Sequence, residues 1–306
     1  MNHKPEKLLL LDTASLYFRA FYGVPDKVKA ADGSSVNAVR GLLDMIAKLV
    51  TTYEPSRLVA CWDDDWRPAW RVDLLPSYKA HRVVEAVPAG PDVEEIPDPL
   101  EAQIPLIREA LAVLGIPVVG AAEHEADDVI GVLATRADVP VDVVTGDRDL
   151  FQLIDDDRGI RIVYTARGMS NLELVDDAAV FAKYGVHAKQ YADFAVLRGD
   201  PSDGLPGVSG IGEKSAAALL TACGDLDGIR AGVLEGTAGT PAQRAKIAAA
   251  ADYLEVAPTV VRVARELDLE PFDDRLGPVD RSAAEELAER WNLGSSMTRA
   301  LAALPA

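Results

Sequence analysis

Short apolar segments alternate with amphipathic segments along the first half of this 306-residue chain, and several apolar segments end in an aspartate. Segments of strand length lie at 7–11, 57–62, 116–119, 141–145 and 161–164. Segments with apolar residues at helical spacing lie at 36–50, 100–114 and 125–135. Because strands that alternate with helices form parallel sheets, the sequence predicts an α/β fold with a mostly parallel central sheet flanked by helices.

The chain changes character after residue 180. From Phe181 onward it is helical and rich in alanine, with a glycine-rich turn at 206–214. An earlier segment, 66–99, is long and rich in proline, and it carries the cations Arg67, Arg71, Lys79 and Arg82. A loop this long in a compact domain usually has a function or is disordered. We expect a core domain over 1–180, with an insertion at 66–99, and a helical region over 181–306.

Composition limits where such a chain can work. No apolar run approaches the roughly 20 residues of a membrane helix, and the run at 8–11 ends at Asp12, too early for a signal peptide. Two cysteines exclude a disulfide framework and a cysteine-rich zinc site. We expect a cytoplasmic protein. A net charge of −18 argues at first against DNA binding, unless much of the acid is gathered where divalent cations neutralise it.

Asp12, Asp63 and Asp147 each follow the carboxyl end of a predicted strand. In open α/β sheets this edge is where ligands bind, so separate parts of the sequence would bring carboxylates to one place. A single aspartate in this position is better explained as a helix cap. Several at one edge favour a binding site.

The densest acidic motif is Glu125-Ala126-Asp127-Asp128. Glu125 and Asp128 would share one helix face, whereas Asp127 points elsewhere unless the motif forms the first helical turn. Three carboxylates this close repel one another unless cations offset the charge. The alternative is an ordinary acidic helix start, which the helix dipole favours.

Two further carboxylate pairs follow, Asp147 with Asp149 and Asp200 with Asp203. The first pair could instead form a loop with an internal contact to Arg148. Oxygen ligands without histidine or cysteine suit Mg²⁺ or Mn²⁺ rather than zinc. Two such ions about 4 Å apart can activate a water molecule and stabilise the leaving oxygen of a phosphodiester.

The glycine-rich turn is neither a Walker A motif nor a complete dinucleotide fingerprint, because Glu213 separates Gly212 from Lys214 and the third glycine is missing. Its segment 208–212 is similar to a helix–hairpin–helix turn. The amides of such a turn and of the following helix would meet a DNA phosphate. A plain tight turn between helices is the alternative.

Taken in order, these motifs resemble those of the 5′-nuclease family, which includes flap endonucleases, phage 5′-exonucleases and the N-terminal nuclease domain of bacterial family A DNA polymerases. The resemblance runs from Leu8 to about Leu220. It rests on Leu11-Asp12, Tyr17-Phe18-Arg19-Ala20-Phe21, Tyr78-Lys79-Ala80-His81-Arg82, Glu125-Ala126-Asp127-Asp128-Val129, Gly146-Asp147-Arg148-Asp149-Leu150 and the stretch 199–214. No polymerase module follows, so the chain is similar to a stand-alone member.

The resemblance implies a phosphodiesterase that uses two or more Mg²⁺ or Mn²⁺ ions. One ion would lie near Asp12, Asp63, Glu125 and Asp127, and the other near Asp128, Asp147, Asp149, Asp200 and Asp203. It also implies that 66–99 forms a helical arch or clamp through which a single 5′ strand passes. Lys79 and Arg82 would then be the catalytic cations, with Lys79 steering the scissile phosphate.

For the DNA contacts the resemblance points to Arg19, Lys79, Arg82 and the turn residues Val208, Gly210, Gly212 and Lys214. Arg19 either touches a phosphate or supports the site. In relatives such a turn also holds a monovalent cation, which here would be K⁺.

Two departures from the family pattern matter. Asp203-Gly204 stands where the family commonly has Asp-Asn, so any role of that amide is missing. The alignment around Asp63-Asp64-Asp65 is ambiguous: strand phase favours Asp63, and gapless counting back from Trp70-Arg71 favours Asp64. We choose Asp63.

The predicted function is a 5′-3′ exonuclease and structure-specific flap endonuclease that acts on DNA flaps, nicks and 5′ ends in replication or repair. We expect a monomer associated with the nucleoid. The alternatives are a PIN-like ribonuclease, which the turn at 208–212 argues against, and an inactive DNA-structure-binding protein. A mere binder gains nothing from crowding carboxylates where phosphate must sit.

Overall fold

A computed structural model describes residues 6–87 and 91–304. Its centre is a six-stranded sheet with the strand order β5-β2-β1-β6-β7-β8. The strands are β1 (Leu8–Asp12), β2 (Arg57–Cys61), β5 (Val118–Val119), β6 (Val141–Thr145), β7 (Ile160–Tyr164) and β8 (Glu173–Val175). Every neighbouring pair is parallel except β7 and β8. The predicted mostly parallel sheet is confirmed, and the antiparallel edge strand β8 was not predicted.

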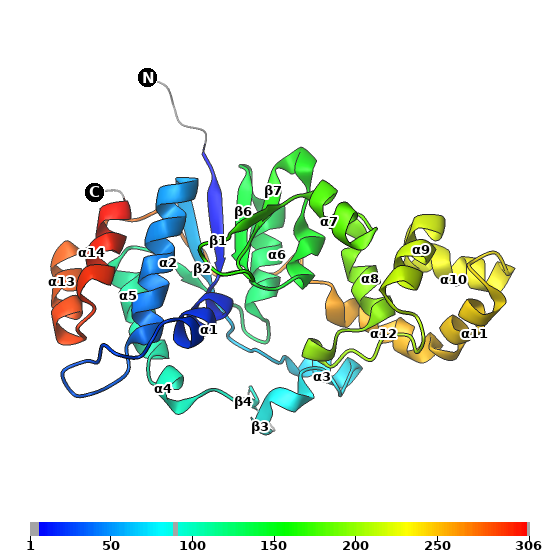
Figure 1. Cartoon of the computed structure of the whole chain (residues 1–306), viewed down its shortest axis with the longest axis horizontal. Helices are drawn as coiled ribbons and strands as arrows, with labels where there is room; N and C mark the ends of the chain where they lie inside the picture. Colours follow the sequence, from blue (N-terminus) through cyan, green and yellow to red (C-terminus); the bar gives the residue numbers. More distant parts are fainter. Residues whose placement is uncertain (1–5, 88–90, 305–306) are drawn as a thin grey trace.

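Helices cover both faces of the sheet (Figure 1). Alternate residues of β1 divide between two hydrophobic cores, because successive side chains of a strand point to opposite faces. Leu9 and Leu11 pack with α1 (Thr13–Gly23), α2 (Asn37–Tyr53) and α5 (Ile104–Val113). Leu8 and Leu10 pack on the other face, with α6 (Ala126–Arg136). Burial on both faces explains why β1 is an unbroken apolar run that ends at an aspartate.

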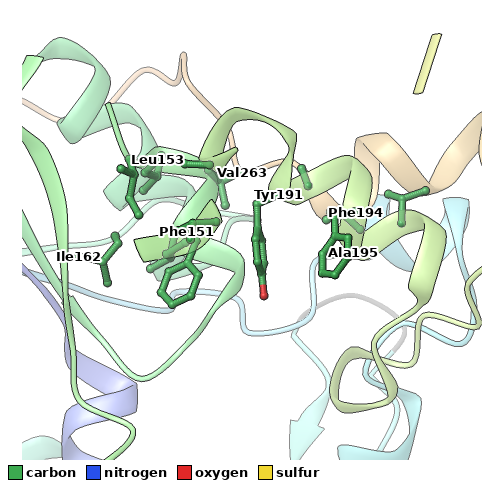
Figure 2. Packing of buried hydrophobic residues seen from close by; sticks show 14 of the residues in the cluster. Phe151, Leu153, Ile162, Tyr191, Phe194, Ala195 and Val263 are labelled. Atoms are coloured by element: carbon green, nitrogen blue, oxygen red, sulfur yellow. The ribbon is translucent and has the colours of Figure 1, made fainter. Parts of the chain in front are cut away.

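The second core continues from the sheet into the helical half of the chain. Figure 2 shows Phe151, Tyr191, Phe194 and Val263 packed together in this core. The elements here are α7 (Asp177–Tyr184), α8 (Tyr191–Arg198) and the 3₁₀ turns η2 (Asp149–Leu153), η3 (Asp156–Arg158) and η4 (Ala188–Gln190). The segment that follows Asp147 is therefore held by a large apolar cluster, which fixes the backbone next to the strand end.

The helical half is not one block. It contains η5 (Pro201–Asp203), α9 (Glu213–Cys223), α10 (Leu226–Glu235), α11 (Pro241–Ala249), α12 (Ala251–Val261), α13 (Arg281–Arg290) and α14 (Gly294–Ala303). Helices α9 to α11 extend away from the sheet, whereas α13 and α14 lie beside α2 and α5 at the opposite end of the molecule (Figure 1). Met297 and Leu301 of α14 are buried in the same core as α2. The chain past residue 281 thus completes the core that the first 120 residues begin.

The described residues of the insertion at 66–99 are mostly not helical, unlike a helical arch, which is one of the two forms that the sequence led us to expect. It contains α3 (Ala69–Leu74), η1 (Ala80–Arg82) and a two-stranded ribbon of β3 (Val83–Glu85) and β4 (Val93–Glu94); residues 88–90 lie outside the described part. Proline removes a backbone donor and blocks helix interiors, and five prolines between 66 and 97 leave room for one short helix only.

The helix predicted at 100–114 is divided into α4 (Asp98–Glu101) and α5 (Ile104–Val113). The break falls at Gln103, whose buried side chain accepts hydrogen bonds from the first amides of α2, at Ala38 and Val39. Across 6–87 and 91–304, no helix combines the length and the apolar character needed to cross a membrane.

Candidate active site

A cavity of about 330 Å³ opens at the carboxyl ends of β1, β2 and β6. Carboxylates from six separate segments line it: Asp12, Asp63, Glu94, Glu125, Asp127, Asp147 and Asp200. Trp66, Lys79 and Arg82 from the insertion complete the wall. The structure therefore brings most of the predicted acids to one sheet edge, and it adds Glu94, which we had not singled out.

Asp12 is fixed in place by two neighbours. It is the N-cap of α1, where its Oδ1 accepts a hydrogen bond from the Ser15 amide at 3.1 Å. Its Oδ2 accepts a hydrogen bond from the Thr145 hydroxyl, across the sheet on β6, at 2.6 Å. Helix capping and a place in the cavity are thus combined in one residue, so the two interpretations of an aspartate after a strand do not exclude each other.

The structure distinguishes Asp63 from Asp64. Asp63 lines the cavity, and its Oδ1 accepts a hydrogen bond from the Ala126 amide at the start of α6, at 2.8 Å. Asp64 is exposed and faces Arg108 on α5, 3.5 Å away. Asp63 is the residue in position to bind a ligand of the cavity, as strand phase suggested.

The acidic motif at the start of α6 divides its side chains between two environments. Glu125 is the N-cap, and Asp127, in the first helical turn, lines the cavity. Asp128 is fully buried and does not line the cavity; Arg71 Nη1 and Nη2 donate to its two oxygens at 2.8 and 2.7 Å. The Ala264 amide adds a third bond at 2.9 Å. In this structure both oxygens of Asp128 therefore accept hydrogen bonds from Arg71, which they hold in place.

Arg71 and Tyr78 fix the side chain of Glu125 by hydrogen bonds to one of its carboxylate oxygens. Arg71 Nη1 donates to Glu125 Oε1 at 2.9 Å, and the Tyr78 hydroxyl donates to the same oxygen at 2.7 Å. Arg71 Nε also donates to the carbonyl of Val260 on α12, at 3.1 Å. We gave Arg71 and Tyr78 no role of their own from the sequence. The sequence showed only an arginine in the insertion. The contacts of α3 with α6 and α12 in the structure show that Arg71 is buried.

Lys79 and Arg82 face the cavity, but each is paired with an acid there. Lys79 Nζ forms an ion pair with Glu125 Oε2 and donates to the Trp66 carbonyl at 3.3 Å. Arg82 Nη2 lies 3.2 Å from Asp203 Oδ1. Arg67 is buried against Asp92. All four insertion cations thus have acidic partners inside the protein, so the insertion is less basic in effect than its sequence suggests.

The second group of acids lies beyond β6 and α8. Asp147 lines the cavity, and its Oδ1 accepts a hydrogen bond from the Asp149 amide at 2.8 Å. Asp200 lines it too and forms an ion pair with Arg198 at 3.2 Å. Asp149 and Asp203 instead line a smaller adjoining cavity of about 20 Å³, together with Glu125 and Asp127. The buried Oδ1 of Asp149 has no hydrogen-bond partner among the described residues.

Crowding and burial raise the pKa values of several of these carboxyls. Burial, together with the charges of Asp63 and Asp147, raises the pKa of Asp12 to about 7 despite its two hydrogen bonds. Burial also raises the pKa of Asp203 to about 6, with Lys79 and Arg82 opposing and Asp147 adding to the rise. The pKa values of Asp127 and Asp149 are raised by burial and by neighbouring carboxylates. The site is short of positive charge.

These acids fit a hard cation. In the described residues, no three histidine, cysteine or acidic side chains already stand together as a finished metal centre. The oxygen ligands that side chains offer around the cavity are nevertheless mostly carboxylates, which Mg²⁺ and Mn²⁺ prefer. The unpartnered Asp149 oxygen and the raised pKa values are what a missing positive charge would leave behind.

The glycine-rich turn follows Asp200 and Asp203 along the chain and joins α8 to α9. Val208 and Ile211 are buried, Gly210 has a φ of +74°, and Gly212 is the N-cap of α9. Lys214 is exposed in the first turn of α9. The Gly210 carbonyl accepts a hydrogen bond from Lys246 of α11 at 3.1 Å. A carbonyl of the kind that would face a K⁺ ion is thus already bound to a lysine of the chain.

Known proteins are similar to this chain in both sequence and fold. Residues 7–185 match the family model of the 5′-3′ exonuclease N-terminal resolvase-like domain, and residues 186–282 match that of the 5′-3′ exonuclease C-terminal SAM fold. A 5′-3′ exonuclease of Streptomyces coelicolor is 60% identical over 301 residues, which cover 97% of this chain and 100% of that one. DNA polymerase I of Mycobacterium bovis is 42% identical over 72% of this chain and 23% of its own length.

The fold is also found among solved structures. The bacteriophage T5 flap endonuclease, in a pseudo-enzyme-product complex with DNA and metal ions, superposes with a TM-score of 0.62 at 15% identity. The superposition covers 97% of this chain and 99% of that one. At this level of identity the likeness shows the fold, which has the mostly parallel sheet described above.

The raised pKa of Asp12 predicts how the metal-free protein responds to pH. Ionised Asp12 opposes folding above pH about 7, and this cost fades as the pH falls toward 3.8, where the folded carboxyl is neutral. Asp12→Asn keeps an oxygen that can cap α1. We expect it to stabilise the metal-free protein at pH 8, by up to about 4 kcal/mol at about 1.4 kcal/mol for each pH unit between 3.8 and 7.

Denaturant unfolding at several pH values measures this effect. The gain should shrink steadily from pH 8 to pH 4. Asp64→Asn is the matched control, because Asp64 lies outside the cavity, and it should give no such gain. A pH-independent gain in Asp12→Asn, or none at all, would contradict the charge crowding described here.

Proposed function

The chain belongs to the 5′-3′ exonuclease family, and we propose that it is a Mg²⁺- or Mn²⁺-dependent nuclease that hydrolyses DNA near free 5′ ends, both as exonuclease and as flap endonuclease. One observation carries the proposal: carboxylates from separate segments line a single cavity and face two cations of the insertion. A DNA substrate places its action at the nucleoid, and we propose that it works there as a monomer.

The acids divide into two groups that would each hold a metal ion. Asp12, Asp63, Glu125 and Asp127 form one group, and Asp147, Asp149, Asp200 and Asp203 form the other. When bound, two such ions supply charge stabilisation and an activated water for phosphodiester hydrolysis. Arg71 and Tyr78 support the first group by donating hydrogen bonds to Glu125 Oε1. Glu125 Oε2 is then the oxygen that could exchange its ion pair with Lys79 for a metal ion.

Lys79 and Arg82 are the side chains that would meet the phosphate. Both line the cavity. Lys79 forms an ion pair with Glu125 of the first group, and Arg82 forms one with Asp203 of the second group. The φ of +47° at Lys79 holds the insertion backbone in a left-handed turn at this point. The cations therefore neutralise the acids until a phosphate offers them another anionic partner.

The turn at 206–214 would bind duplex DNA beside the cavity. Its exposed backbone amides and the start of α9 suit a phosphate, and Lys214 adds a charge. Lys246 donates a hydrogen bond to the Gly210 carbonyl. In this structure its ammonium group therefore contacts an oxygen of the kind that would bind a K⁺ ion. Asp200 leads directly from α8 into this turn, which ties duplex binding to the second group of acids.

Cleavage assays test the proposed function. Flapped, nicked and single-stranded DNA and matched RNA, labelled at the 5′ or the 3′ end, are incubated with Mg²⁺, with Mn²⁺ or with excess EDTA. We expect metal-dependent cleavage of DNA near 5′ ends. Asp127→Asn should reduce the rate by at least about 100-fold, since even outer partners of metal ligands cost about 10–100-fold.

The other outcomes identify the alternatives. Cleavage of RNA in preference to DNA would point to a PIN-like ribonuclease, and DNA binding without cleavage would point to an inactive binding protein. Full activity in EDTA would contradict the metal requirement.

The division of labour between the insertion and the turn predicts different effects for two lysines. Lys79→Ala should slow the chemical step by about 100- to 1,000-fold, as the loss of a positioned charge-stabilising donor does. Lys214→Ala should mainly weaken binding and lower the slope of log affinity against log salt by about 0.9. Single-turnover cleavage at saturating enzyme and binding of nicked duplex at several salt concentrations measure the two effects.

Lys189→Ala provides the control, because it removes an exposed lysine that lines a different cavity and does not belong to the turn, and it should change neither measurement. A normal single-turnover rate in Lys79→Ala, or unchanged duplex affinity in Lys214→Ala, would refute the assignment of that lysine.

A further inference from the structure

One departure from the 5′-nuclease pattern, the glycine that follows Asp203, lies at a contact between two parts of the site. Gly204 ends the 3₁₀ turn η5 at a φ of +71°. Asp200 and Leu205 pair on either side of η5 through two backbone hydrogen bonds, of 3.0 and 2.8 Å. The turn is therefore closed on itself, and it carries both Asp200 and Asp203 of the second group of acids.

The base of the insertion rests on this turn. Ser77 Oγ donates a hydrogen bond to the Gly204 carbonyl at 2.8 Å. The Lys79 amide donates a hydrogen bond to the Asp203 carbonyl at 3.0 Å. Arg82 is attached to the same residue by the ion pair of its Nη2 with Asp203 Oδ1, at 3.2 Å. Both cations that line the acidic cavity are thus held on η5, one through its backbone and the other through its side chain.

The contact needs a glycine at position 204. A β-carbon on Gly204 would lie 2.0 Å from the Ser77 carbonyl oxygen and 3.3 Å from the Lys79 amide nitrogen. The first distance is far shorter than a van der Waals contact, and the opposing atom belongs to the backbone rather than to a flexible side chain. The asparagine that is common in the family tolerates a positive φ, but its β-carbon would push the insertion off the turn.

We propose that Gly204 is a positioning residue for DNA cleavage, because it lets η5 hold the base of the insertion and so sets where Lys79 and Arg82 stand relative to the second group of acids. The inference rests on the proposed function and deepens it. Lys79 would meet the scissile phosphate, while Asp200 and Asp203 would hold one of the metal ions. A displacement of about 1 Å in such an arrangement can lower a rate by about 100-fold.

Gly204→Ala tests the proposal, because it adds only the β-carbon. We expect the single-turnover cleavage of flap DNA at saturating enzyme to slow by about tenfold to 100-fold. The affinity for nicked duplex without divalent ions should stay unchanged, since the turn at 206–214 is left intact. Amide hydrogen exchange adds a measurement that needs neither metal nor cleavage. The Lys79 amide should exchange faster in the variant, because its hydrogen bond to the Asp203 carbonyl is lost.

Gly185→Ala is the matched control. Gly185 has the same φ of +71° at the end of α7, and a β-carbon there would come within 4 Å of the Ala217 β-carbon only, at 3.6 Å. Both variants carry the same backbone strain, so a loss of thermal stability that comes from this strain should appear in both. The slower cleavage and the faster exchange of the Lys79 amide should appear in Gly204→Ala alone.

A double-mutant cycle shows whether Gly204 acts through Lys79. In a Lys79→Ala background the position of that side chain no longer matters, so Gly204→Ala should slow cleavage by a much smaller factor than in wild type. Equal factors in the two backgrounds would overturn the proposal. Gly204→Asn carries the same β-carbon and should also slow cleavage, whereas a rate above that of wild type would show that the glycine only lacks a useful amide.

The outcomes separate this inference from the proposed function. A wild-type rate in Gly204→Ala, an equal loss in Gly185→Ala, or unchanged exchange of the Lys79 amide would overturn the positioning role while leaving the nuclease intact. Absence of metal-dependent cleavage of any DNA by the wild-type protein would overturn the proposed function, and the positioning role with it. The exchange measurement would then still report whether the insertion rests on η5.

Discussion

Repulsion among crowded carboxylates is the constraint around which the rest of this structure is arranged. The parallel sheet delivers Asp12, Asp63 and Asp147 to one edge, and α6 adds Glu125 and Asp127 from the side. Burial makes ionisation costly, as the raised pKa values show. The protein offsets part of this cost with internal cations, and the remainder is available to a metal ion. A net charge of −18 is thus compatible with binding DNA, because part of it is concentrated where cations bind.

Arg71 connects this acidic site to distant parts of the chain. It bonds Glu125 and Asp128 on α6 and the Val260 carbonyl on α12, while it belongs to α3 of the insertion. The helical half therefore contributes to the acidic site, since α12 helps to fix the orientation of a carboxylate in the cavity. Breaking a buried charge network of this kind is costly because it leaves unpaired charges behind. Insertion, core and helical half are joined at one guanidinium.

The sequence was sufficient for the features that depend on local pattern. The strand that ends at Asp12, the strand just before Asp63, the helix that Glu125 caps and the turn at 206–214 all appear in the structure. Features that depend on which elements touch could not be predicted. Helical spacing groups Asp128 with Glu125, and only the packing of α3 shows that Asp128 turns toward Arg71.

The insertion and the chain end were missed for similar reasons. The prolines of the insertion predict an irregular segment but do not predict the β3–β4 ribbon. The packing of α14 against α2 is a long-range contact that no local sequence pattern encodes.

The central claim is that the carboxylates of one cavity bind two divalent ions. Anomalous diffraction from crystals soaked in Mn²⁺ tests this claim most directly. The account predicts two manganese peaks in the acidic cavity, one beside Asp12 and Asp127 and one beside Asp147 and Asp200, and both should vanish in EDTA. Manganese found only at surface carboxylates, or none in this cavity, would contradict it.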